Sequence, residues 1–173
     1  TSGGFFRDCS IHDFDAVRFV TGREVVSVYA VGENRGEAFF AESGDFDSAA
    51  AVLTLDDGTI ALISGSRYNA RGYDVRLEAL GSKDSVCVGM DDRLPLRSLE
   101  GGVEFPAGRP YADFMERFHQ AYFDEMVAFT ELVAGRIETP CSVQDGLQAL
   151  LIAEACAISR REGRPVRMDE VGQ

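Results

Sequence analysis

Residues 48–66 are Ser-Ala-Ala-Ala-Val-Leu-Thr-Leu-Asp-Asp-Gly-Thr-Ile-Ala-Leu-Ile-Ser-Gly-Ser. Two β-rich runs, 48–55 and 59–66, flank an Asp-Gly pair at positions 57 and 58. Asp-Gly between two such runs is the strongest short-range signal for a β-hairpin. The stretch therefore predicts two antiparallel strands joined by a tight turn.

Strand-like runs continue on both sides of this hairpin. Glu24–Val31 is rich in Val, and residues 75–80 alternate apolar and charged side chains, which leaves one wet and one dry face. The remaining predicted strands are Val86–Met90, Leu94–Leu99 and a short final strand within Arg164–Met168.

Three segments have helical periodicity instead. Ser10–Thr21 begins with a good N-cap residue, Ser10, and is followed by Gly22, a common helix stop. Tyr111–Ala134 carries one apolar stripe, and the segment that Ser142 caps, running to about Glu162, is rich in small apolar residues.

The order of these elements indicates the fold class. A run of strands followed by long helices is typical of α+β proteins. We expect an open, mostly antiparallel sheet of about six strands with helices packed on one face. The other face must meet water, another domain or another subunit.

Composition excludes some classes of partner. The 173 residues suffice for one domain of ordinary size, or two very small ones, and carry a net charge of −12. Because nucleic-acid affinity comes largely from Lys and Arg, and anionic membranes also attract basic surfaces, we expect neither partner. No apolar run approaches the roughly 20 residues that a spanning helix needs.

The four cysteines are isolated in the sequence, at positions 9, 87, 141 and 156, without zinc-ligand spacing. Such cysteines fit a reducing cytoplasm and are most often small buried apolar residues. The chain has no initiator Met and no signal peptide, and its chemically richest stretch comes first. We therefore expect a cytoplasmic protein of which this chain is a part.

That first stretch contains the best candidate for chemistry. Asp8, His12 and Asp15 are spaced by four and three residues, so on a helix they share one face. A His beside carboxylates can act as a general acid or base. Alternatively, Asp8 caps the helix, His12 is a surface or capping residue and Asp15 is solvated. A metal site is a weaker possibility, because no further ligand has suitable spacing.

A second candidate is the polar and aromatic segment 67–74, in which Arg67, Asn69 and Tyr73 could face a polar ligand. The alternative is an irregular hairpin whose aromatic rings pack on the core. His119 is interpreted as a residue on the surface of a helix. The sequence contains neither G-x-G-x-x-G after a strand nor G-x-x-x-x-G-K, so it shows no phosphate-binding loop.

These motifs carry a resemblance to a known family. The string Gly3–Asp8 followed by Ile11–Asp15 resembles the opening of the C-terminal domain of the glucose–fructose oxidoreductase and inositol dehydrogenase family, close to its myo-inositol 2-dehydrogenase-like members. The resemblance extends over nearly the whole chain. Its other matching segments, individually weak but in the right order, are Gly72–Asp74, Gly81, residues 114–122 with Glu125, the Ser142–Leu147 helix start and Gly163–Val166.

The resemblance implies a fold and a domain organisation. Residues 1–173 would form a dihydrodipicolinate-reductase-like C-terminal domain for substrate binding and oligomerisation. An N-terminal Rossmann domain, absent from this chain, would bind NAD or NADP. The sheet face would pair copies of the chain into a homo-oligomer.

The resemblance also implies residue roles. Asp8 and His12 match two members of the family's catalytic set, whose third member is a Lys of a Glu-Lys-Pro motif that this chain lacks. Asp15 and Tyr73 match residues that bind substrate hydroxyls. We expect oxidation of a cyclitol or sugar hydroxyl to a ketone, and no activity from the isolated chain. The alternative is a non-catalytic assembly module of the same fold.

Overall fold

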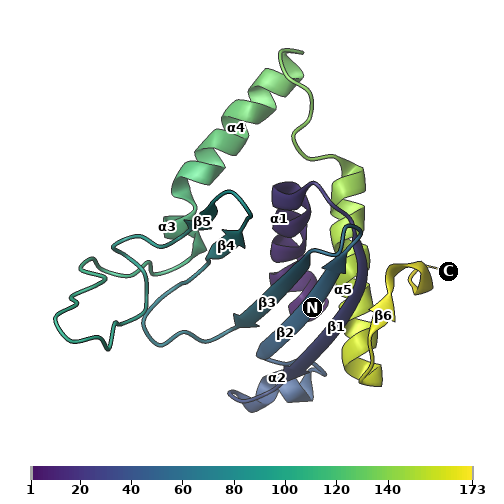
Figure 1. Cartoon of the computed structure of the whole chain (residues 1–173), viewed down its shortest axis with the longest axis horizontal. Helices are drawn as coiled ribbons and strands as arrows, with labels where there is room; N and C mark the ends of the chain where they lie inside the picture. Colours follow the sequence, from purple (N-terminus) through teal and green to yellow (C-terminus); the bar gives the residue numbers. More distant parts are fainter. Residues whose placement is uncertain (1, 173) are drawn as a thin grey trace. The chain divides into compact units, whose positions relative to one another are not determined.

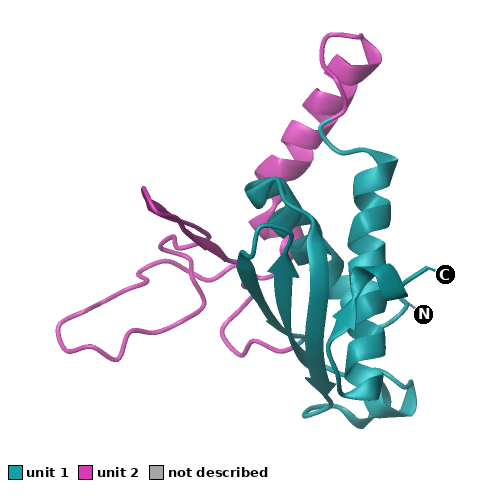
Figure 2. Ribbon diagram, turned by 45° about the vertical axis from the view of Figure 1, so that its right-hand side comes forward, with its two compact units in different colours: residues 1–67, 140–173 teal, residues 68–139 magenta. Residues whose placement is uncertain are grey.

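The structure is a computed structural model that describes residues 2–172. The chain divides into two compact units, coloured separately in Figure 2. Unit 1 contains residues 1–67 and 140–173, and unit 2 contains residues 68–139.

Unit 1 contains a four-stranded antiparallel sheet in the order β3-β2-β1-β6. The predicted hairpin is confirmed: the amide of Leu55 donates to the carbonyl of Thr59 at 2.9 Å, and Gly58 takes φ +86°, which the turn requires. The strands are β1 (Val25–Glu33), β2 (Ser48–Leu55), β3 (Ile60–Ser66) and β6 (Val166–Arg167).

Helices α1 (Ile11–Thr21) and α5 (Val143–Glu162) belong to the same unit, with α5 packed on β1 and α1 packed on α5 (Figure 1). Ser142 and Asp145 form the capping box at the start of α5. The unit also contains the short helices α2 (Ala38–Glu42) and η2 (Met168–Glu170).

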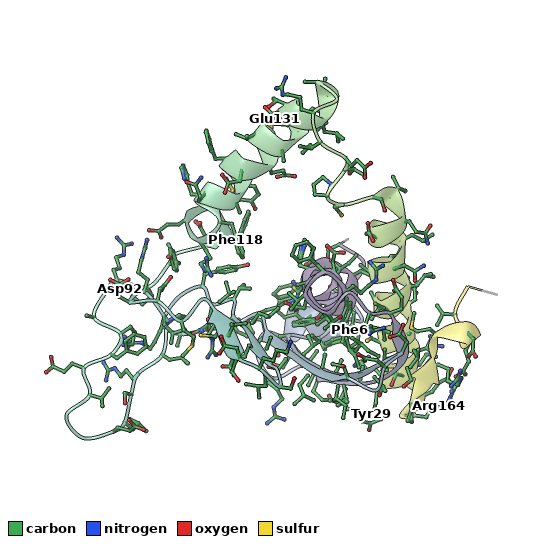
Figure 3. All side chains as sticks on the ribbon, turned by 45° about the horizontal axis from the view of Figure 1, so that its top comes forward. Phe6, Tyr29, Asp92, Phe118, Glu131 and Arg164 are labelled. Atoms are coloured by element: carbon green, nitrogen blue, oxygen red, sulfur yellow. The ribbon has the colours of Figure 1, made fainter. Side chains whose placement is uncertain are left out.

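The core lies between the sheet and these helices. Its fully buried members come from every layer and include Phe14, Leu53, Leu55, Ile152 and Val166. The opposite face of the sheet is uncovered: Tyr29, Val52 and Leu62 are paired neighbours across three strands, and Leu62 is 77% exposed. Figure 3 shows Tyr29 on the side of the sheet away from Phe6 and the helices. We call this apolar row the open face.

The first helix starts earlier than predicted. A single π-helical turn, η1 (Phe6–Ser10), runs directly into α1, so Ser10 is a buried residue inside the helix and not its cap. The side chain of Asp45, 40 residues away in the sequence, accepts a hydrogen bond from the Phe5 amide at 3.0 Å. It thereby satisfies one backbone donor at the start of the helix. The predicted end is correct, since Gly22 adopts φ +63°.

Unit 2 contains the two-stranded hairpin β4 (Leu77–Leu80) and β5 (Ser85–Val88), followed by α3 (Phe114–Arg117) and α4 (His119–Val133). The α+β class and antiparallel pairing are confirmed, but the strands form separate sheets of four and two. The predicted strand at 94–99 is wrong; those residues are irregular, and Leu94 is buried.

The predicted helix 111–134 is shorter and interrupted. The Asp113 side chain accepts the amide of Glu116 at 2.9 Å and so starts α3, and Phe118 departs from helical dihedral angles (φ −108°, ψ 19°) between α3 and α4. No helix within residues 2–172 is both long and apolar enough to cross a membrane.

The expectation for the cysteines is correct for one of them. Cys156 is fully buried, Cys9 is partly buried, and Cys87 and Cys141 are exposed. Cys87 is exposed because it lies on β5, a strand whose four residues are all exposed.

Candidate functional site

One face of the η1–α1 helix carries the first candidate set. Phe6, Ser10, Phe14 and Val17 form its buried side. Asp8 and His12 are exposed, and Asp15 is partly buried. The helical turn that contains Asp8 is π-helical, a rare geometry that occurs frequently at functional sites. The three polar side chains therefore lie on the part of the helix that the core does not use.

Asp8 forms an ion pair. Its Oδ2 accepts from Arg67 Nη1 at 3.0 Å, and the Cys9 thiol lies 3.9 Å from the same oxygen. The alternative role for Asp8, capping the helix, is wrong because Asp45 occupies that position. No hydrogen bond joins Asp8 to His12 in the part of the chain that the structure describes.

The His12 imidazole makes no hydrogen bond or ion pair to any residue from 2 to 172, and it is exposed. Its neighbour Asp13 is partly buried, and this burial raises the pKa of the Asp13 carboxyl, while a positive charge on His12 would lower it. The ring nitrogens of His12 are thus available to a ligand.

Asp15 lies beside a network of charges. Its carboxylate is 3.9 Å from Arg18, which also donates to Glu24 at 2.8 Å and to Asp145 at 3.2 Å. The Glu24 and Asp145 carboxylates raise the pKa of Arg18. Arg18 thereby ties α1 to the start of α5, and the Asp15 side chain stays 42% exposed.

Tyr73 belongs to unit 2. Its ring packs edge-on against Phe114 and Phe118, with centroid distances of 6.5 and 6.3 Å, and its amide donates to the Tyr111 carbonyl at 2.8 Å. The Tyr73 ring thus packs on two rings of its own unit, and among the described residues neither partner belongs to the buried core. His119 is exposed on α4, as predicted.

Arg67 and Asn69, the other polar members of the second candidate, have partners of their own. Arg67 binds Asp8 and, at 3.1 Å, Asp45, whereas Asn69 Oδ1 accepts the amide of Arg71. Local sequence pattern predicts a polar role for Arg67 but not its partner, because 59 residues separate Arg67 from Asp8. Asp45 was missed altogether, and no local motif pointed to it.

The described residues form no metal centre: within 2–172 no group of three or more His, Cys, Asp or Glu side chains is placed to hold a metal ion. What the η1–α1 face offers is a set of acceptors and a titratable ring. Carboxylate oxygens accept hydrogen bonds from hydroxyl groups, and an imidazole can take up a proton near neutral pH. The arrangement suits a neutral ligand with several hydroxyls.

Comparison with known families gives one match over nearly the whole chain. A family model described as "Oxidoreductase family, C-terminal alpha/beta domain" matches residues 1–168. An uncharacterized oxidoreductase of Bacillus subtilis is 41% identical over 170 residues, which cover 98% of this chain and 49% of that protein. Inositol 2-dehydrogenase of Rhizobium meliloti is 36% identical over 171 residues, covering 95% and 50%.

Solved structures are similar to the chain over the same extent. A probable dehydrogenase from Thermotoga maritima superposes with a TM-score of 0.88 at 32% identity, covering 99% of this chain and 51% of that one. Scyllo-inositol dehydrogenase from Lactobacillus casei, solved with bound NAD(H) and scyllo-inositol, gives 0.84 at 32% identity, covering 98% and 49%. The chain spans about half the length of the relatives that it matches.

Proposed function

Because this chain belongs to the glucose–fructose oxidoreductase and inositol dehydrogenase (Gfo/Idh/MocA) family of oxidoreductases, as the C-terminal alpha/beta domain, we propose that it supplies the substrate-binding half of an NAD(P)-dependent polyol dehydrogenase. The reaction is oxidation of one secondary hydroxyl of a cyclitol or sugar, similar to myo-inositol, to a ketone. The observation that supports this proposal most directly is the exposed face that carries Asp8, His12 and Asp15.

In this proposal His12 is the general base. Oxidation of a secondary alcohol removes the hydroxyl proton and a hydride from the same carbon, and the two electrons of the broken C–H bond leave with the hydride. A nicotinamide cofactor, when bound, accepts that hydride. His12 takes the hydroxyl proton, because an imidazole with an unoccupied ring nitrogen is the side chain that most often serves as a general base.

The carboxylates orient the substrate. Asp8 lies one helical turn before His12 and Asp15 one turn after it, so their oxygens flank the reacting hydroxyl and accept hydrogen bonds from neighbouring hydroxyls. Fixing several hydroxyls in this way holds the reacting carbon in one position, which lowers the entropic part of the barrier. We also propose a substrate-binding role for Tyr73, which rests on the family resemblance.

The cofactor is proposed to be bound mainly by an N-terminal Rossmann half that lies outside these 173 residues. The chain itself has no glycine-rich phosphate-binding loop, and the residues of the candidate face are acceptors for hydroxyls, not donors for phosphate. The relative solved with NAD(H) and scyllo-inositol supports a nicotinamide cofactor and a polyol substrate of this class. NAD or NADP both fit the proposal.

The test is a substrate panel on the protein that joins this chain to its nucleotide-binding half. Inositol isomers and sugars are assayed with both cofactors, and the best pair is used to compare His12→Ala with His119→Ala. His12→Ala should lower kcat by at least about 100-fold, the usual scale for loss of a general base. His119, the other exposed histidine, is the matched control and should leave kcat unchanged. Near-normal kcat in His12→Ala would contradict the assignment.

The isolated chain should not reduce NAD in the presence of inositol, since the half that we propose to bind the cofactor is missing. Measurable turnover by residues 1–173 alone would disprove this division of labour between the two halves.

The open face favours a second role, assembly. Monomeric proteins seldom leave several large apolar side chains adjacent on a sheet, and Tyr29, Val52 and Leu62 form such a row. We propose that a second copy of the chain covers this row. If a non-catalytic assembly module is the whole function, His12→Ala will have no phenotype while disruption of the open face will.

A further inference from the structure

We propose that Arg67 is a positioning residue for the dehydrogenase reaction: it holds the Asp8 carboxylate in the orientation that receives the substrate. This inference rests on the proposed function. Arg67 lies at the end of unit 1, directly after β3, and its side chain reaches across to the η1 turn.

The guanidinium group bridges two carboxylates. Nη1 donates to Asp8 Oδ2 at 3.0 Å, and Nη2 donates to Asp45 Oδ2 at 3.1 Å. Asp45 uses its other oxygen, Oδ1, to accept the Phe5 amide at the helix start. One arginine therefore connects the turn that carries Asp8 to the residue that caps that same helix.

Aromatic rings and the backbone further restrict the guanidinium. Its carbon lies 5.4 Å from the Phe5 ring centroid and 5.3 Å from that of Phe40, both within cation–π range. The Arg67 amide donates to the Asp47 carbonyl at 2.8 Å, which fixes the base of the side chain. Held at both ends, the guanidinium presents its Nη1 to Asp8 in one direction.

Burial increases from Asp8 toward Asp45. The Asp8 side chain is 37% exposed, whereas those of Arg67 and Asp45 are 19% and 16% exposed. Oδ1 of Asp8 makes no hydrogen bond among the described residues, so one oxygen is fixed by Arg67 and the other remains for a ligand hydroxyl. Arg67 therefore orients the Asp8 carboxylate through one oxygen and leaves the other oxygen for a ligand.

Stability alone does not account for this arginine. Its Nε is buried and has no hydrogen-bond partner among residues 2–172. A buried unpaired donor costs folding free energy, and such costs are tolerated mainly where the group serves another purpose. Supporting a substrate-binding carboxylate is such a purpose, because binding groups need a rigid surrounding shell.

The test is a double-mutant cycle in the protein that joins this chain to its nucleotide-binding half. Arg67→Met, Asp8→Asn and the double variant are compared by kcat and KM for the best polyol of the panel. If Arg67 acts through Asp8, Arg67→Met should lower kcat/KM by at least about 10-fold in the protein that keeps Asp8. In the Asp8→Asn variant, the same substitution should lower kcat/KM by less than about 3-fold. Arg67→Lys, which keeps a charge but cannot bridge both carboxylates, should fall between.

Arg160→Met is the matched control. Arg160 also packs on a ring, 4.3 Å from the Phe46 centroid, and donates to the Gly32 carbonyl, but within residues 2–172 it makes no hydrogen bond or ion pair with Asp8. It should leave kcat/KM within about 3-fold, and thermal unfolding of every variant identifies those that fail to fold.

The outcomes separate the two proposals. In the first outcome, the unsubstituted protein is active, and the losses of kcat/KM from Arg67→Met and Asp8→Asn multiply independently. This result overturns the role of Arg67 and leaves the proposed function intact. An unsubstituted protein that oxidises no polyol with either cofactor overturns the proposed function, and the inference falls with it. If Arg67→Met does not fold, the cycle is run with Arg67→Lys, for which the same coupling to Asp8 is required.

Discussion

Ser159 offers a sharp test of how α5 is attached to the sheet. It is fully buried in α5, where its Oγ accepts the Ala30 amide of β1 at 2.9 Å and donates to the Arg164 carbonyl at 2.6 Å. Within residues 2–172, the strand β6 pairs with Ser27 and Val28 of β1 and does not reach the Ala30 amide. Ser159 replaces the missing strand partner at that position.

Ser159→Ala leaves the Ala30 amide buried without an acceptor. A buried orphaned donor costs about 1–3 kcal/mol, and alanine regains a few tenths through its higher helix propensity. We expect unfolding free energy to fall by about 2 kcal/mol. For a chain of this size that corresponds to a decrease in Tm of about 4–8 °C.

The measurement is urea and thermal unfolding of the chain, followed by circular dichroism. Ser10→Ala is the matched control, because Ser10 is also a buried helical serine but its hydroxyl makes no hydrogen bond within residues 2–172. It should stay within about 0.5 kcal/mol of the unsubstituted chain. Equal losses in the two variants, or no loss in Ser159→Ala, would refute the argument that Ser159 acts through its hydrogen bonds.

Three further predictions concern acid stability, thiol reactivity and assembly. Hydrogen bonds from Ser142 lower the pKa of Asp145 from 3.8 to about 2. The contribution of the Asp145 carboxylate to folding stability is therefore present above about pH 4 and is lost as pH falls toward 2. Asp145→Asn should flatten this part of the curve of unfolding free energy against pH. Burial raises the pKa of Cys156 to about 12, so alkylation at pH 8, followed by mass spectrometry, should label exposed Cys87 in the native chain and Cys156 only after unfolding. Leu62→Glu should convert an oligomer to monomer in sedimentation, and a chain that is already monomeric at high concentration would contradict pairing through the open face.

Local pattern was sufficient for the elements whose signals are local. The Asp57-Gly58 turn and the αL glycines at 22 and 163 end strands and helices for steric reasons that do not depend on the rest of the chain. The α+β class follows from the order of such elements, and the structure bears it out. The face that carries Asp8, His12 and Asp15 was likewise predictable from helical spacing.

Local pattern failed where a distant residue decides the outcome. Ser10 has the chemistry of an N-cap, but Asp45 accepts the Phe5 amide and the helix starts earlier. The run 94–99 has apolar residues but no strand beside it in the structure, and an isolated strand cannot satisfy its backbone hydrogen bonds.

The sequence by itself determined the fold class and the residues that can share one exposed helix face, because helix and hairpin periodicity are set by steric rules between near neighbours. Tertiary structure decided how those residues are held. Arg67 contacts Asp8 because β3 packs beside η1. The two residues are 59 positions apart in the sequence, so their pairing is decided by tertiary packing and is not contained in any local pattern.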